Sequence, residues 1–372
     1  MMAGIRLDAI PRIPGTNTRS RYPEISMGCT AVDVVIGGGL PLSSLCIIDE
    51  NKSRAYATVL SKYFSAEGIC CEHSLFIAST SRNPLELLED LPDRINIASN
   101  DVLNDGVERP EDSTMKIAWR YSTAPKVDSS LSCSRRGIPQ YDLMKKMDCK
   151  KMEACSISFF PDSVKSQDEL PSYNDLYKRI QQKLTDDEYS ITLLKPKRRV
   201  LRVVIEGIGS PFWQDPENDL KFVAHLRTLL CSYCAVAMLI TNSSGMLNER
   251  KERLYAYGDL VVHLDAVECD NTMENFGDRF DGYFRLLKLP NMASIATYCP
   301  ASSDLVFQLQ KRKFDIRILH LPPALDDDKM KSFGPNCQEI RNFFDIQMTK
   351  CWWLAVCICG NNNVVTCDFH PC

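Results

Sequence analysis

The chain of 372 residues carries 44% hydrophobic and 25% charged side chains, proportions typical of a globular protein with a sizeable core. A formal net charge of −4 excludes a globally basic surface, so any contact with nucleic acid must come from local patches. The apolar runs are far shorter than the ~18 residues that span a bilayer, so we expect no membrane contact. Seventeen scattered cysteines indicate reduced thiols, so we expect a cytoplasmic protein, with the nucleus as a second location.

The N-terminal quarter of the chain predicts a leader followed by a strand and a helix. Residues 1–25 contain several prolines and arginines without apolar periodicity, which indicates a flexible leader. Ser44–Asp49 is a short apolar run typical of a buried strand. Apolar residues at helical spacing in 52–64 then predict a helix that ends at Gly68.

A second strand and helix follow before the pattern is lost. Ser74–Ala78 predicts a buried strand, and Asn83 before Pro84 is the usual pair of N-cap and first residue at the start of a helix. The stretch 91–171 is rich in Asp, Ser, Lys and Pro, and we expect it to be a partly ordered insertion.

Helical periodicity returns after Ser172, which we expect to cap a helix ending near Leu184. Strands are then predicted at Val200–Ile205, Val236–Ile240 and Leu260–Leu264, with helices between them at Leu220–Leu230 and Glu249–Leu254. Strands separated by helices predict a parallel sheet. Tyr283–Leu289 and Leu305–Leu319 alternate without a helix between them, which predicts antiparallel strands at one sheet edge.

These elements predict an α/β fold class: a mostly parallel sheet with helices on both faces and antiparallel C-terminal strands. We expect one domain over residues 26–335 that includes the insertion, and a divergent, poorly ordered tail over 336–372.

Gly28–Leu45 resembles the entry to RecA-like and KaiC-like ATPase domains, in which the first core strand is followed by a Walker A phosphate loop. Here that place reads Asp49-Glu50-Asn51-Lys52-Ser53-Arg54. The loop has no glycine to wrap a triphosphate, and its two carboxylates oppose an anion. We therefore expect a degenerate Walker A motif whose Lys52-Ser53 pair lies at a solvated helix N-terminus, against the alternative of a functional phosphate loop.

The other catalytic positions of a RecA-like ATPase are also incomplete. Ser79-Thr80-Ser81 stands where a carboxylate usually activates water. Glu206 ends a predicted buried strand and could meet Mg²⁺, but one acid does not make a metal site. We expect no catalytic residue, no cofactor and no bound metal.

The wider pattern closely resembles the PAXNEB family of Elongator complex subunits, over about Arg21 to Cys337. The strings that carry the resemblance, in this order, are Tyr63–Gly68 (YFSAEG), Met115–Tyr121 (MKIAWRY), Gly209–Trp213 (GSPFW) and Arg312–Pro323 (RKFDIRILHLPP). Each string is weak alone, but their common order over most of the chain makes coincidence improbable. From Gln338 the sequence departs from the family pattern.

The resemblance implies a RecA-like, non-catalytic subunit. It would form a hexameric ring with Elongator subunits five and six, work with the catalytic Elongator subcomplex, and bind tRNA for carboxymethyl-type modification of the wobble uridine. Two alternatives remain open: an ATPase subunit that turns over ATP at ring interfaces, and a pure assembly scaffold without RNA contact.

Two basic clusters are candidate RNA contacts, since arginine and lysine neutralise phosphates. Their residues are Lys195, Lys197, Arg198 and Arg199 before a strand, and Lys311, Arg312, Lys313 and Arg317 near the C-terminal hairpin. The alternative for each is a solvated face or a subunit interface. Phe212 and Trp213 are expected to pack on the core or on a neighbouring subunit, and burial at an interface is the favoured interpretation. We expect Cys231 and Cys234 to be core thiols, since zinc needs a second ligand pair.

Overall fold

The centre of the fold in this computed structural model is a nine-stranded mixed sheet in the order β14-β13-β12-β11-β4-β10-β9-β5-β8. The structure describes residues 13–17, 22–51, 55–95, 131, 140–161, 170–191, 198–267, 280–291, 298–300 and 302–319. None of the helices in these ranges is long and apolar enough to cross a membrane.

One side of the sheet is parallel and the other antiparallel. The parallel strands are β8 (Ile157–Phe160), β5 (Ser74–Ser79), β9 (Leu201–Ile208), β10 (Ala235–Thr241), β4 (Leu45–Glu50) and β11 (Leu260–Ala266). The antiparallel strands are β12 (Gly282–Lys288), β13 (Leu305–Leu309) and β14 (Phe314–Ile318). This arrangement confirms the predicted fold class.

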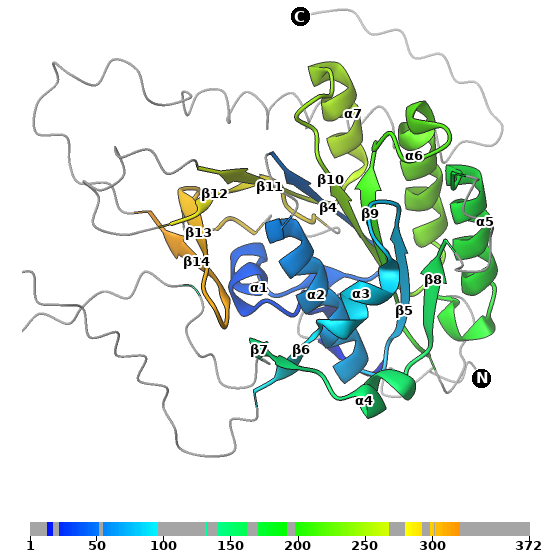
Figure 1. Cartoon of the computed structure of the whole chain (residues 1–372), viewed down its shortest axis with the longest axis horizontal. Coiled ribbons are helices and arrows are strands. Elements are labelled where there is room, and N and C mark those ends of the chain that lie inside the picture. The colour runs from blue at the N-terminus through cyan, green and yellow to red at the C-terminus, as the bar shows by residue number, and fades with distance from the viewer. Residues whose placement is uncertain are drawn as a thin grey trace, which may run out of the picture. The chain divides into compact units, whose positions relative to one another are not determined.

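Helices cover the two faces of the sheet (Figure 1). One face carries α1 (Thr30–Ile36), α2 (Ala55–Cys70) and α3 (Pro84–Glu89), and the other carries α5 (Tyr173–Leu184), α6 (Asp219–Leu230) and α7 (Asn248–Tyr257). Because successive strand side chains point to opposite faces, Leu45 and Ile47 enter the core under α5–α7, while Cys46 and Ile48 enter the core under α1–α2. Each central strand is therefore apolar on both sides.

The helix starts predicted by capping residues are confirmed. The Asn83 side chain accepts a hydrogen bond from the Leu85 amide at 3.1 Å, and Ser172 accepts one from the Asp175 amide at 3.1 Å. The predicted helix end at Gly68 is wrong, because α2 continues to Cys70. A Cβ at Gly68 would lie 2.8 Å from Arg202 Cδ, so glycine is needed there for close packing instead of as a helix stop.

The glycine and aspartate of the Gly28–Leu45 motif hold the chain together locally. Gly28 has a φ of 79°, and a Cβ there would lie 2.2 Å from the Tyr63 carbonyl oxygen. Asp33 of α1 accepts hydrogen bonds from the Ser26 hydroxyl and from the Met27 amide at 2.8 Å. Burial raises the pKa of Asp33 to about 7, although these hydrogen bonds act in the opposite direction.

Smaller elements pack segments that the sequence left unassigned. The strands β1 (Thr16–Asn17), β2 (Glu24–Ile25) and β3 (Leu40–Pro41) form a small antiparallel sheet. Within residues 91–171, β6 (Pro92–Arg94) pairs with β7 (Tyr141–Lys146), α4 covers Cys149–Glu153, and β8 joins the main sheet beside β5. The described part of the predicted leader therefore contains two paired strand segments, and the insertion supplies an edge strand.

A buried arginine connects these segments to the main sheet. Arg202 of β9 is fully buried, and its Nη1 donates to the carbonyl oxygens of Ser26 and Phe64 at 2.9 and 3.1 Å. Its Nε donates to His73 Nδ1 at 3.0 Å, and His73 Nε2 lies 2.8 Å from the Pro14 carbonyl oxygen. Arg202 therefore fixes the ring of His73, which in turn holds the N-terminal segment.

The His73 ring has to be neutral in this arrangement, because Nδ1 accepts from Arg202 while Nε2 carries the proton donated to Pro14. Burial, and then the nearby charge of Arg202, lower the pKa of His73 to about 3. An unfolded histidine titrates near pH 6.5, so below that pH the unfolded state gains a proton that the folded state does not. Stability attributable to His73 is present above pH ~6.5 and lost as the pH falls toward 3.

We predict that His73→Asn removes this loss of folding stability at acidic pH. Between about pH 7.5 and 5 the His73 contribution falls by about 2 kcal/mol, whereas an asparagine side chain does not titrate. The measurement is the free energy of unfolding in urea at both pH values. His225→Asn is the control, since His225 is exposed and should leave the pH dependence of the wild type intact. An equal pH dependence in His73→Asn and wild type would show that His73 is not held neutral.

Candidate functional site

The candidate site lies at the carboxyl ends of the parallel strands, where open α/β sheets usually bind their ligands. Strand β4 ends here at Glu50 and leads toward α2, the position that a phosphate loop takes in nucleotide-binding relatives of this fold. Asn51 is described, whereas Lys52 and Ser53 lie outside the described residues.

A carboxylate of the chain itself occupies the start of α2. The Glu50 side chain is fully buried, and it accepts hydrogen bonds from the backbone amides of Ala57 at 3.0 Å and Tyr56 at 3.4 Å. These amides belong to the first turn of the helix, where unpaired N–H groups and the helix dipole favour an anion. Glu50 thus takes donors that would otherwise face a phosphate.

The neighbouring carboxylate, Asp49 of β4, points to the opposite face of the sheet. There it contacts α7, β11 and the loop after β10. It accepts from the Ser243 amide and hydroxyl at 2.8 and 2.6 Å, and from the Tyr255 hydroxyl at 2.5 Å. His263 Nδ1 lies 2.8 Å and Lys251 Nζ 3.7 Å from the same carboxylate. Burial would raise the pKa of Asp49, but the hydrogen bonds outweigh it and lower the pKa to about 2.

The acid that could have met Mg²⁺ is paired with an arginine. Glu206 of β9 is buried, and its Oε2 accepts from Arg82 Nε at 2.9 Å, with a second contact between Arg82 Nη2 and Oε1. Ser61 of α2 donates to the same carboxylate at 3.4 Å, and Arg82 Nη2 also reaches Thr58 Oγ1 at 3.3 Å. A guanidinium therefore stands where a cation would have to approach Glu206.

The end of β5 supplies hydroxyls instead of a general base. Ser79 is the last residue of β5 and pairs in register with Glu206. The Ser79 and Thr80 side-chain oxygens are buried and have no hydrogen-bond partner among the described residues. The described residues contain no cluster of three or more His, Cys, Asp or Glu placed to hold a metal.

The structure places only part of the first basic cluster. Lys195 and Lys197 lie outside the described residues. Arg198 is half-buried and donates to the Ile191 carbonyl oxygen at 3.3 Å, and Arg199 is exposed with Glu188 3.7 Å away. Both described arginines contact groups of their own chain just before β9.

The second cluster lies on the β13–β14 hairpin, separated from β9 in the sheet order by β12, β11, β4 and β10. Lys311 and Arg312 are exposed in the turn, and Lys313 is half-buried beside them. Arg317 of β14 donates to Asp315 at 2.9 Å. The structure therefore brings Lys311, Arg312 and Lys313 together, whereas Arg198 and Arg199, the described members of the first cluster, lie just before β9, with four strands between β9 and this hairpin in the sheet order.

The aromatic pair Phe212-Trp213 divides between surface and core. Trp213 is buried, its Nε1 donates to the Gly207 carbonyl oxygen at 2.8 Å, and its ring stacks on Tyr173 at a centroid distance of 4.4 Å. Interface burial is therefore wrong for Trp213, which packs within its own chain. Phe212 is 53% exposed. Trp119 and the tail from Gln338 lie outside the described residues.

Sequence reasoning missed the partners that neutralise these carboxylates. Arg82 has no motif around it, and it stands 124 residues from Glu206. His263 belongs to no catalytic motif of the sequence, and in the structure it contacts Asp49. No spacing rule connects such pairs, because they meet only when the sheet has formed.

The PAXNEB protein family model matches residues 11–342 of the chain. The chain belongs to the PAXNEB family. The PAXNEB chain is 31% identical over 344 residues to Elongator complex protein 4 of Danio rerio, covering 85% of this chain and 86% of that protein. It is 29% identical to Elongator complex protein 4 of Homo sapiens, covering 90% and 89%, and 27% identical to that of Schizosaccharomyces pombe, covering 85% and 91%.

A solved structure, the KaiC-like protein of Pyrococcus horikoshii OT3, covers 79% of the PAXNEB chain and 98% of its own chain, with a TM-score of 0.44 and 12% sequence identity.

We predict that Glu50→Gln lowers the free energy of unfolding of the PAXNEB chain by about 1–2 kcal/mol, because a charged acceptor is lost at a helix N-terminus. The measurement is urea unfolding followed by circular dichroism. Glu249→Gln is the matched control: this carboxylate also lies in a first helical turn, but its side chain is 77% exposed, and we expect a change below about 0.5 kcal/mol. Equal stability of Glu50→Gln and wild type would contradict the role assigned to Glu50.

Proposed function

We propose that the chain is a non-catalytic subunit of the Elongator complex. Membership of the PAXNEB family supports this, as do curated relatives named Elongator complex protein 4 that align over most of both chains. In this role the chain forms a hexameric ring with subunits five and six, works with the catalytic subcomplex, and helps present tRNA for carboxymethyl-type modification of the wobble uridine. Its place of action is the cytoplasm, with the nucleus as a second location.

The observation that carries the non-catalytic assignment is the buried Glu50 carboxylate on the first turn of α2. A triphosphate bound there would have to displace an anion that is covalently part of the chain, and would then face Asp49 one residue away. The Arg82–Glu206 ion pair adds to this, since metal binding at Glu206 would have to break a buried charge pair.

Contact with tRNA would depend on local patches summed over several subunits. The exposed cations of the hairpin turn, Lys311 and Arg312, and the group around Arg198 and Arg199 are the candidates on this chain. Each phosphate contact adds a salt-dependent increment of affinity, and linked sites on a ring raise the total without any strong single site.

A pure assembly scaffold is the second candidate function, and one observation favours it. Arg198, Arg199 and Arg317 all contact groups of their own chain, namely the Ile191 carbonyl, Glu188 and Asp315. The carboxylates beside Arg199 and Arg317 reduce the charge offered to RNA, and the contact with the Ile191 carbonyl occupies one donor group of Arg198. ATP turnover at ring interfaces is the third candidate, in which another subunit would supply the phosphate loop.

We predict that neutralising Lys195, Lys197, Arg198 and Arg199 to glutamine weakens tRNA binding by the co-expressed assembly of subunits four, five and six. The slope of log affinity against log salt should become shallower by about 0.7 for each phosphate that the variant no longer neutralises, if the contacted RNA is single-stranded. The measurement is tRNA binding over a range of salt concentrations, with and without ATP.

A second variant carries the same change at Lys311, Arg312, Lys313 and Arg317, and the control removes Lys150 and Arg253, exposed cations outside both clusters. Size-exclusion chromatography checks that each assembly is intact. An unchanged slope in both cluster variants would overturn RNA contact by this chain and leave the scaffold. Failure of the wild-type chain to assemble with subunits five and six would overturn the proposed function itself.

A further inference from the structure

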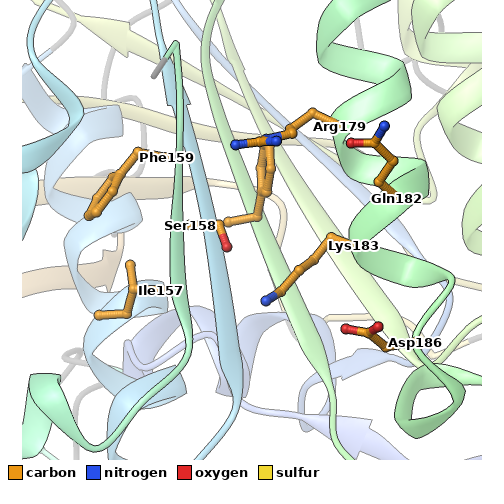
Figure 2. Close-up of a pocket in the computed structure, with 8 residues that line it drawn as sticks. Ile157, Ser158, Phe159, Arg179, Gln182, Lys183 and Asp186 are labelled. Carbon is orange, nitrogen blue, oxygen red and sulfur yellow. The ribbon is translucent and has the colours of Figure 1, made fainter. Parts of the chain in front are cut away.

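A pocket lies away from the carboxyl ends of the strands, between the edge strand β8 and helix α5. Figure 2 shows this pocket in close-up. It has a volume of about 460 Å³, within the range of roughly 300–1,000 Å³ that small-molecule sites occupy. The residues that line it are Phe76, Ile157, Ser158, Phe159, Arg179, Gln182, Lys183 and Asp186.

Helix α5 and the turn that follows it supply a row of charges to the pocket. Arg179 and Lys183 are one helical turn apart, and Asp186 follows three residues later. All three side chains therefore line the same pocket. Figure 2 shows the Arg179 and Lys183 side chains extending from α5 toward the sheet. The order is two cations and then a carboxylate, which suits a ligand with an anionic group at one end and hydroxyl donors at the other.

The lysine is held in position from the opposite wall. Lys183 Nζ donates to the Ser156 hydroxyl, immediately before β8, at 2.9 Å. An ammonium fixed by a neutral hydroxyl keeps its full positive charge and two further protons to donate. Lys183 is half-buried, so its attraction for an anion is screened less than that of a fully exposed lysine.

The sheet side of the pocket combines an apolar surface with one hydroxyl. Phe76 of β5 is 1% exposed and lies among the lining residues, and Ser158 of β8 points toward α5 in Figure 2, whereas Ile157 and Phe159 point to the other side of the strand. The Phe76 ring is too buried for a ligand to stack on it, so the polar group that the sheet side offers is the Ser158 hydroxyl, which can pair with a polar edge of a ligand.

We propose that the β8–α5 pocket binds a phosphorylated nucleoside, either as a free nucleotide or as one unit of an RNA strand. The phosphate contacts Arg179 and Lys183, a carboxylate oxygen of Asp186 accepts from the ribose hydroxyls, and the base lies toward the Ser158 hydroxyl. This site is separate from the start of α2, where Glu50 takes the phosphate donors, and it does not depend on assembly into a complex.

The test is a titration of the purified full-length chain by calorimetry with adenosine 5′-monophosphate, adenosine and inorganic phosphate. We expect the monophosphate to bind more tightly than either of its parts, because it alone engages both ends of the charge row. Lys183→Gln and Arg179→Gln should each weaken its binding about tenfold, the effect of losing one charge-assisted hydrogen bond. Asp186→Asn should weaken the binding of the monophosphate, since it removes the acceptor for the ribose hydroxyls. It should strengthen the binding of inorganic phosphate, since it removes a negative charge that repels the anion.

Lys178→Gln is the matched control, because it removes the same charge from α5 at an exposed residue that does not line the pocket. Thermal unfolding of every variant separates loss of binding from loss of folding. A short oligoadenylate distinguishes the source of the ligand: an equal loss of oligoadenylate binding in Lys183→Gln indicates an RNA unit, and unchanged oligoadenylate binding indicates a free nucleotide. Wild-type binding of phosphate as tight as that of the monophosphate, or an equal loss in Lys178→Gln and Lys183→Gln, would overturn the proposal.

Discussion

The strands β4, β9 and β10 lie between two layers of helices, so every side chain along them must fit into an interior without water. Apolar residues satisfy this condition on both faces, and they fill most of these strands. Polar groups remain only where another group of the chain pairs with them, because an unpaired buried charge costs several kcal/mol. The positions of the buried charges, and hence the character of the site, follow from this constraint.

At the amino ends of the strands the constraint is met by Arg202. It supplies donors to carbonyl oxygens and to His73, and through them it anchors the segments around Ser26 and Pro14. These segments also bury Ile13, Ile25 and Met27 in the core, and Arg202 adds polar contacts to this apolar packing. A buried guanidinium therefore acts as a structural centre, and the neutral state of His73 is a consequence of its contact with Arg202.

At the carboxyl ends the same condition is met by pairing carboxylates within the chain. Glu50 accepts hydrogen bonds from amides of α2, Asp49 accepts them from Ser243, and Glu206 pairs with Arg82. A nucleotide-binding enzyme leaves such donors and acids open to phosphate and metal, at a cost in stability. Here the groups pair with one another and stabilise the fold, and ligand binding is proposed for the β8–α5 pocket instead.

The sequence by itself determined the elements that local rules describe: the parallel strands and their helices from apolar periodicity, the caps Asn83 and Ser172, and the absence of phosphate-loop glycines. It did not reveal β8, whose four residues have no distinctive period, or the end of α2 beyond Gly68. The tertiary structure alone decided which groups neutralise Glu50 and Glu206, which segments Arg202 holds, and how α5 and β8 enclose a pocket. The physical reason is that these contacts join residues far apart in the chain, such as Arg82 and Glu206, whose meeting depends on strand order and register and not on local spacing.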